Sequence, residues 1–297
     1  MAMDRCRLCP RDCGVDRTAG QRGRCGMTDQ VMAARAALHM WEEPCISGEE
    51  GSGTVFFSGC SLGCVFCQNH EIALGDTGKE ITVERLAEIY LELQAKGANN
   101  INLVTAGHFL PQVIRSLRLA KEQGLQIPIV YNTGGYEKVE AIRMLDGLVD
   151  IYLPDLKYVS SQLSARYSGA PDYFTVASAA QAEMVRQTGP AVFDERDMLV
   201  RGTVVRHLLL PGCLEDSKAV IRYLYETYGD QIYISIMNQY TPLPHVKKWP
   251  EIDRRVTEEE YDALVDYAID LGVENGFIQE GETAEESFIP AFDIEGV

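Results

Sequence analysis

The chain has 297 residues, of which 46% are hydrophobic and 24% are charged, as is typical of a globular protein. Its formal net charge of -17 argues against nucleic acid and anionic membranes as partners, because both repel an acidic surface. The first residues lack the apolar stretch of a signal peptide, and no apolar run is long enough to predict a membrane span. We therefore expect a cytoplasmic protein.

The cysteines indicate metal binding. Seven of the nine lie in two groups within the first 67 residues, whereas Cys45 and Cys213 lie apart and are expected to be ordinary buried thiols. In a chain without a secretory signal, grouped cysteines are typical of metal ligands rather than of disulfides.

The first group has the spacing C-x2-C-x3-C-x11-C and comprises Cys6, Cys9, Cys13 and Cys25. Four thiolates form a complete tetrahedral set, so we expect a metal in a structural or electron-transfer role. Zinc ribbons use two C-x2-C pairs and only one is present, whereas a [4Fe-4S] cluster accepts less regular spacing. The spacing favours iron–sulfur slightly and leaves zinc open.

Residues 27–52 are compatible with helix or strand, and we divide the chain into a cysteine-rich segment with its lead-in, 1–52, and a main domain, 53–297. Beyond residue 52, apolar β-rich runs alternate with segments of helical period, which predicts a parallel α/β sheet. A doubly wound sheet and an open barrel both fit this pattern. The predicted strands are 53–59, 101–105, 127–133, 149–157, 203–211 and 231–238, and the predicted helices are 82–98, 111–123, 137–146, 172–188, 215–228 and 257–271.

The second cysteine group, Cys60, Cys64 and Cys67, follows the first predicted strand, at the end of a parallel sheet where active sites gather. Two interpretations compete. With His70 the thiolates complete a closed Cys3His zinc site. Alternatively they hold three irons of a [4Fe-4S] cluster and leave the fourth iron open for a ligand. The spacing alone does not decide between them.

The neighbouring residues carry a resemblance. C-x3-C-x-aromatic-C, with Phe66 as the aromatic residue, is similar to the signature of the S-adenosylmethionine (SAM) radical superfamily. Further stretches resemble its pyruvate formate-lyase activating enzyme-like group, namely "EEPCISGEEGSGTVFFSGCSLGCVFCQN" at 42–69, "DLK" at 155–157, "RHLLLPG" at 206–212, "MNQYTP" at 237–242 and "ENGFIQE" at 274–280. The resemblance implies an open partial (β/α)6 TIM-like barrel of parallel strands carrying the N-terminal metal-bound segment.

The resemblance also implies an oxidoreductase activity. A [4Fe-4S] cluster would reductively cleave SAM, and the resulting 5′-deoxyadenosyl radical would abstract hydrogen from a substrate. The expected partners are a low-potential electron donor such as flavodoxin or ferredoxin and, in one alternative, a protein substrate whose glycine backbone is activated. The other alternative is modification of a small molecule or peptide. A non-catalytic iron–sulfur or zinc redox or sensor protein is the alternative of a different class.

Residues with cofactor roles follow from the same resemblance. Phe66 would pack near the adenine. Thr105, Ala106 and Gly107 match the superfamily's Gly-Gly-Glu stretch, which meets the methionine amino group, but His108 stands where an acid is usual and is assigned instead to the substrate.

Polar residues near the ends of the later strands complete the predicted site. Asp155 and Lys157 are two apart and share one face of a strand, and the resemblance implies that they contact SAM, with Lys157 near its carboxylate. The adjacent Arg206 and His207 point to opposite faces, and we predict that His207 faces the site. Asn132 and Thr133 are expected to point toward the cofactor, Asn238, Gln239 and Tyr240 toward the substrate, and Gln279 to close the barrel or to be structural.

Overall fold

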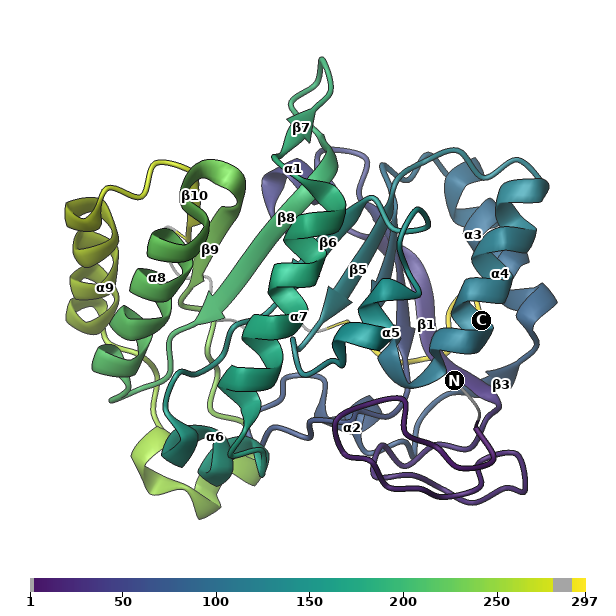
Figure 1. Cartoon of the computed structure of the whole chain (residues 1–297), viewed down its shortest axis with the longest axis horizontal. Coiled ribbons are helices and arrows are strands. Elements are labelled where there is room, and N and C mark those ends of the chain that lie inside the picture. The colour runs from purple at the N-terminus through teal and green to yellow at the C-terminus, as the bar shows by residue number, and fades with distance from the viewer. Residues whose placement is uncertain (1–2, 280–289) are drawn as a thin grey trace.

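The computed structural model describes residues 3–279 and 290–297, so residue 280, the last of the 274–280 motif, lies outside these ranges. It shows a mixed α/β fold with one mostly parallel sheet (Figure 1). The strands are β1 Val31–His39, β2 Ser52–Phe57, β3 Lys79–Ile81, β4 Ile101–Val104, β5 Ile129–Thr133, β6 Ile151–Pro154, β7 Val192–Phe193, β8 Leu199–Leu208, β9 Tyr233–Met237 and β10 Gly276–Ile278. The α-helices are α1 Pro44–Ser47, α2 His70–Ala73, α3 Val83–Ala95, α4 Leu110–Glu122, α5 Val139–Arg143, α6 Ser161–Ser168, α7 Tyr173–Thr188, α8 Leu214–Tyr228 and α9 Glu258–Leu271.

The strand order explains where the helices lie. The sheet runs β10-β9-β8-β6-β5-β4-β2-β1-β3, with β7 paired to β8. All six predicted strands are present as β2, β4, β5, β6, β8 and β9, which are parallel and neighbour one another in chain order. Every crossover therefore steps in the same direction, and right-handed crossovers place the connecting helices on one face. The doubly wound alternative is wrong, because the strand order never reverses.

The segment that sequence left undetermined, 27–52, contributes the strand β1. It pairs antiparallel with β2, from Ala33 opposite Phe57 to His39 opposite Ser52, and also pairs with β3. The predicted domain boundary after residue 52 thus falls at the first residue of β2, a strand that is hydrogen-bonded to β1.

Burial accounts for the apolar pattern of the central strands. Every residue of β2, β4, β5 and β6 is buried, which is why these strands appear in the sequence as uninterrupted runs rather than alternating ones. The predicted N-cap of α3 is confirmed, because the Thr82 hydroxyl accepts the backbone N–H of Arg85 at 3.1 Å. None of the helices in the described ranges is long and apolar enough to cross a membrane.

The N-terminal segment, residues 3–30, contains neither helix nor strand and lies beside α2, below the carboxyl ends of the parallel strands (Figure 1). Two arginine side chains hold this segment against the rest of the protein through hydrogen bonds. The buried Arg17 guanidinium donates to the backbone carbonyl of His108 at 2.6 Å. Arg11 donates to the carbonyls of Ser61 at 2.8 Å and Leu62 at 2.9 Å, inside the three-cysteine loop.

Candidate active site at the carboxyl ends of the parallel strands

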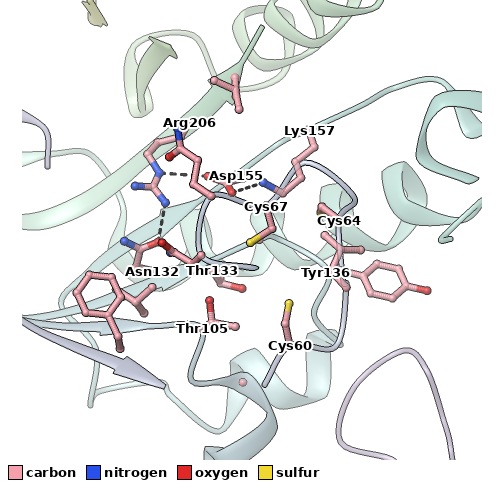
Figure 2. Close-up of a pocket in the computed structure, with 18 of the residues that line it drawn as sticks. Cys60, Cys64, Cys67, Thr105, Asn132, Thr133, Tyr136, Asp155, Lys157 and Arg206 are labelled. Carbon is pink, nitrogen blue, oxygen red and sulfur yellow. Dashed lines mark hydrogen bonds and ion pairs between the residues drawn. The ribbon is translucent and has the colours of Figure 1, made fainter. Parts of the chain in front are cut away.

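One pocket gathers the ends of six parallel strands. Because parallel strands end at the same edge of a sheet, the residues that follow them converge there. Figure 2 shows Cys60, Cys64 and Cys67 around the same pocket as Asp155 and Lys157. The lining includes Cys60, Cys64, Phe66 and Cys67 after β2, Thr105, Gly107 and His108 after β4, Asn132 and Thr133 of β5, Asp155 and Lys157 after β6, Arg206 of β8 and Gln239 after β9.

Two cysteines of this loop, Cys64 and Cys67, have raised pKa values because they are buried. Burial raises the pKa of Cys67 to about 12 and also raises the pKa of Cys64, whose sulfur accepts the Ser168 hydroxyl at 3.1 Å. A bound metal centre supplies the positive charge that displaces such protons. The loop turns at Gly59, whose φ of +86° and contact with Cys25 leave no room for a side chain.

The closed zinc site does not form. The His70 ring packs against His245 with ring centroids 4.3 Å apart, and His70 is not among the residues that line the pocket. Among the described residues, no three His, Cys, Asp or Glu side chains converge closely enough to hold a single metal ion. A four-iron cube binds thiolates at separate corners and therefore accepts a wider set of ligands.

An ion network crosses the pocket above the cysteines (Figure 2). The Asp155 carboxylate contacts the Lys157 ammonium at 2.5 Å and the Arg206 guanidinium at 3.1 Å. Burial by itself would raise the pKa of Asp155, but the two cations outweigh burial and hold that pKa below its ordinary value. The Asp155 carboxylate is therefore held ionised between the Lys157 and Arg206 side chains.

Glu42, to which sequence analysis assigned no role, forms a second ion pair with Arg206. It follows β1, and its carboxylate lies 3.0 Å from the Arg206 guanidinium. Asn132 accepts from Arg206 at 2.6 Å and donates to Glu42 at 3.2 Å. No pattern in 27–52 predicted this position, because its placement depends on β1 pairing with β2.

The loop after β4 has a strained backbone. Thr105 has a φ of +60°, which a β-branched residue rarely adopts, and it lines the pocket. His108 also lines the pocket, is buried and contacts the carbonyl of Ser58 at 2.7 Å. Burial lowers the pKa of His108 to about 3, so its ring is neutral and donates through Nε2.

A second acid to which sequence analysis assigned no role, Glu137, lies beside Gly107 and lines the pocket. The Glu137 carboxylate is buried against Gly107, where a methyl group would come within 2.5 Å of the Oε1 atom. Thr133 donates to it at 2.8 Å and Tyr131 at 3.3 Å. No sequence pattern predicted this position, because it depends on the contact between Glu137 and Gly107.

Glu137 predicts a specific pH dependence of stability. Burial raises its pKa to about 7, so between its ordinary value of 4.5 and pH 7 the native state holds a proton that the unfolded state has released. Stability from this group therefore falls as the pH rises across that window, by about 3 kcal/mol in total. Denaturant unfolding from pH 4.5 to 8 should show this slope in wild type and not in Glu137→Gln. The exposed Glu140→Gln serves as the matched control, and parallel curves for wild type and Glu137→Gln would contradict the assignment.

Some predicted residues lie outside the pocket. His207 faces away from it, and its Nδ1 contacts the carbonyl of Leu156 at 2.7 Å, so the prediction that His207 rather than Arg206 faces the site is wrong. Side chains alternate in direction along a strand, so only one of these two adjacent residues faces the pocket. Arg206 is that residue, because it pairs laterally with Asp155 on the neighbouring strand.

Three further predicted residues do not line the pocket either, namely Ala106, Asn238 and Tyr240. Ala106 is buried in the core. The Tyr240 hydroxyl donates to the carbonyl of Ile252 at 2.6 Å, and its ring packs on Phe66. The backbone N–H of Asn238 donates to Gln279, so Gln279 fastens the end of β9. Their neighbour Gln239 is the residue that lines the pocket.

Comparison with known proteins decides what this arrangement is. Residues 54–182 match the model of the radical SAM superfamily. Over these residues the chain resembles that superfamily. That superfamily implies a [4Fe-4S] cluster and SAM as cofactors.

Relatives differ in what is known of them. An uncharacterized protein of Methanocaldococcus jannaschii is 28% identical over 270 residues, which cover 89% of this chain and 74% of that protein. The pyruvate formate-lyase-activating enzyme of Clostridium pasteurianum is 34% identical over 110 residues, which cover 35% of this chain and 45% of the enzyme.

Solved structures share the fold. SuiB of Streptococcus suis, bound to the precursor peptide SuiA, superposes with a TM-score of 0.51 at 14% identity and covers 75% of this chain. HydG, a maturase of the [FeFe]-hydrogenase, superposes with a TM-score of 0.51 at 15% identity and covers 77%. The chain spans 47% of SuiB and 52% of HydG, so these similarities show the fold alone.

Proposed function

We propose that this protein is a radical SAM enzyme that cleaves SAM reductively and abstracts hydrogen from a substrate. The proposal rests on two sets of residues that line the same pocket. Three cysteines, with no fourth ligand beside them among the described residues, border it on one side, and the cations Lys157 and Arg206, paired with Asp155 and Glu42, lie on the other. A cluster with one open iron needs the first set, and a zwitterionic ligand needs the second.

The pocket residues fit both cofactors. Cys60, Cys64 and Cys67 would hold the cluster. When bound, the cluster and SAM together supply an electron, a carbon–sulfur bond that breaks, and a carbon radical that takes hydrogen from the substrate.

The chain's own residues would bind and orient SAM. Lys157, 5.9 Å above the Phe66 ring, is placed to meet a carboxylate. Glu137, beside Gly107, offers an acid to an ammonium group and substitutes for the glutamate that His108 displaces. Phe66, packed against Tyr158 and Tyr240, offers a fixed aromatic surface to the adenine.

The sheet would serve as an enclosure. We infer that the parallel strands β2 to β9, stepping in one direction, form the open (β/α)6 barrel of this superfamily. A radical reacts with whatever lies nearest, so an enclosed pocket with the substrate carbon at reacting distance prevents side reactions.

The hydrogen donor belongs to one of two classes, a glycine backbone in a partner protein or a small molecule or peptide. Relatives include an activating enzyme and SuiB, whose crystal structure contains its precursor peptide. The polar groups that would face the donor are Glu42, His108 and Gln239, all of which line the pocket.

The proposal is tested by anaerobic reconstitution of the cluster, reduction and incubation with SAM. We expect methionine and 5′-deoxyadenosine as products, measured by chromatography. Deuterium transfer into 5′-deoxyadenosine from labelled cell extract then identifies the substrate fraction. A fully reconstituted and reduced protein that binds SAM but forms no 5′-deoxyadenosine, even with extract present, would contradict the proposal.

A further inference from the structure

The four N-terminal cysteines, Cys6, Cys9, Cys13 and Cys25, lie together although they span 20 residues. A methyl group placed on Gly23 would lie 3.3 Å from the Cys13 sulfur and 3.4 Å from the Cys25 sulfur, so both thiols border one small space. The Cys13 thiol also donates to the carbonyl of Cys6 at 4.0 Å. Electrostatic interactions couple the thiol of Cys9 to those of Cys6 and Cys25. Four sulfur atoms are thus available to one metal centre.

The surroundings suit an anionic centre. The Arg17 guanidinium lies 3.9 Å from the Cys6 sulfur, and the Cys9 sulfur accepts the backbone N–H of Arg11. Residues 1–26 contain six arginines but only three acidic residues, in a chain whose net charge is -17. Four thiolates around a metal centre carry net negative charge, which these cations stabilise.

The arrangement favours a cluster over a single ion. In a tetrahedral zinc site the sulfurs lie about 3.8 Å apart, because each Zn–S bond is about 2.3 Å long. Within the described part of the chain, no three Cys, His, Asp or Glu side chains approach a common point in this way. The spacing of two, three and eleven residues also lacks the second C-x2-C pair of a zinc ribbon.

The segments that carry the two cysteine groups pack against each other. A methyl group on Gly59 would lie 2.6 Å from the carbonyl oxygen of Cys25, so the backbone of Cys25 packs against the residue that precedes Cys60. Arg11 forms a second connection. Its backbone binds the Cys9 sulfur, and its side chain binds the carbonyls of Ser61 and Leu62, between Cys60 and Cys64.

We propose that Cys6, Cys9, Cys13 and Cys25 hold a second [4Fe-4S] cluster, through which the electron reaches the SAM-binding cluster. A reduced one-electron carrier protein gives up one electron and is oxidised. The N-terminal cluster accepts that electron and passes it on, returning to its oxidised state while the SAM-binding cluster is reduced. No proton moves and no bond changes. The relay role rests on the proposed function, whereas the presence of the cluster does not.

The surface around this site fits an acidic carrier. Cys13 is exposed, as are Arg5, Arg7, Arg22 and Arg24. A carrier with negative charge around its own cofactor would be attracted here and repelled by the rest of the acidic molecule. The centre therefore lies at the face where such a carrier is expected to dock.

The presence of the cluster is tested with a protein that lacks the other one, Cys60→Ser/Cys64→Ser/Cys67→Ser. After anaerobic reconstitution we expect about four irons and four sulfides per chain, and an electron paramagnetic resonance signal after reduction that SAM does not change. Zinc in place of iron, or no metal in a protein whose circular dichroism is that of wild type, would overturn the inference. Cleavage of SAM by the wild-type protein reports on the proposed function separately.

The relay is tested with Cys9→Ser/Cys13→Ser, reduced by a flavodoxin in a stopped-flow instrument. We expect this variant to lose most of the rate of reduction by flavodoxin while dithionite still supports cleavage of SAM. Cys213→Ser, outside both groups, should reduce at the wild-type rate. Arg22→Glu/Arg24→Glu keeps every cysteine and should slow reduction by flavodoxin about tenfold at low ionic strength. Equal rates in wild type and in the cysteine variant would overturn the relay.

Discussion

Replacing Cys64 by serine is expected to abolish the formation of 5′-deoxyadenosine. Cys64 lies in the middle of the three-cysteine loop and lines the pocket. With only two thiolates left, the loop would hold the cluster weakly or not at all, and no open iron would remain beside the pocket. The measurement is 5′-deoxyadenosine formed per chain from SAM under dithionite.

The control for this prediction is Cys213→Ser, another half-buried cysteine that belongs to neither group. It should retain wild-type cleavage, because its thiol lies outside the pocket. Thermal unfolding of both variants without iron tests whether the fold is retained. Wild-type amounts of 5′-deoxyadenosine from the Cys64 variant would rule out this loop as the cluster site.

Replacing Asp155 by asparagine should have the largest effect on stability among single changes in the pocket. The substitution removes the carboxylate between Lys157 and Arg206 and leaves two mostly buried cations with Glu42 as the only acid bonded to either of them among the described residues. Breaking a buried ion pair by removing one partner costs about 3–5 kcal/mol. We expect a loss of about 3 kcal/mol in the free energy of unfolding at pH 7, measured with denaturant.

Lys157→Met is the matched comparison. It removes one cation and leaves the pair between Asp155 and Arg206 at 3.1 Å intact, so its effect on stability should be smaller. Its effect on SAM affinity should be large, since Lys157 is the cation placed to meet the carboxylate. The pKa of Asp155 is lowered, so its contribution is complete at neutral pH and is lost as the pH falls below 3.8. Equal stability of wild type and Asp155→Asn at pH 7 would show that the network does not hold the pocket together.

The sequence predicted the parallel strands because burial on both faces leaves continuous apolar runs that turn residues interrupt. It predicted Asp155 and Lys157 because they share one face at a strand end. It failed at Arg206 and His207, since both are polar residues in an apolar strand and only the register with Asp155 selects one. Sequence periodicity carries no information about that lateral pairing.

Glu42 and Glu137 were missed for another reason. Both lie outside the predicted strands, and each reaches the pocket through a tertiary contact. Glu42 depends on β1, a strand whose pattern was equally compatible with a helix. Glu137 depends on the close approach of Gly107, which is visible only when the loops after β4 and β5 are side by side. The N-terminal cysteines were predicted as a group, but their contact with Gly59 was not.

The central claim is that Cys60, Cys64 and Cys67 hold a cluster with an open iron that binds SAM. The most direct measurement is electron nuclear double resonance on the reduced wild-type protein with SAM labelled with ¹⁵N at its amino group and ¹⁷O at its carboxylate. We predict hyperfine coupling of both labels to the cluster, because both groups would bind the open iron. A reduced cluster that shows no coupling to either label, although SAM is bound, would contradict the account.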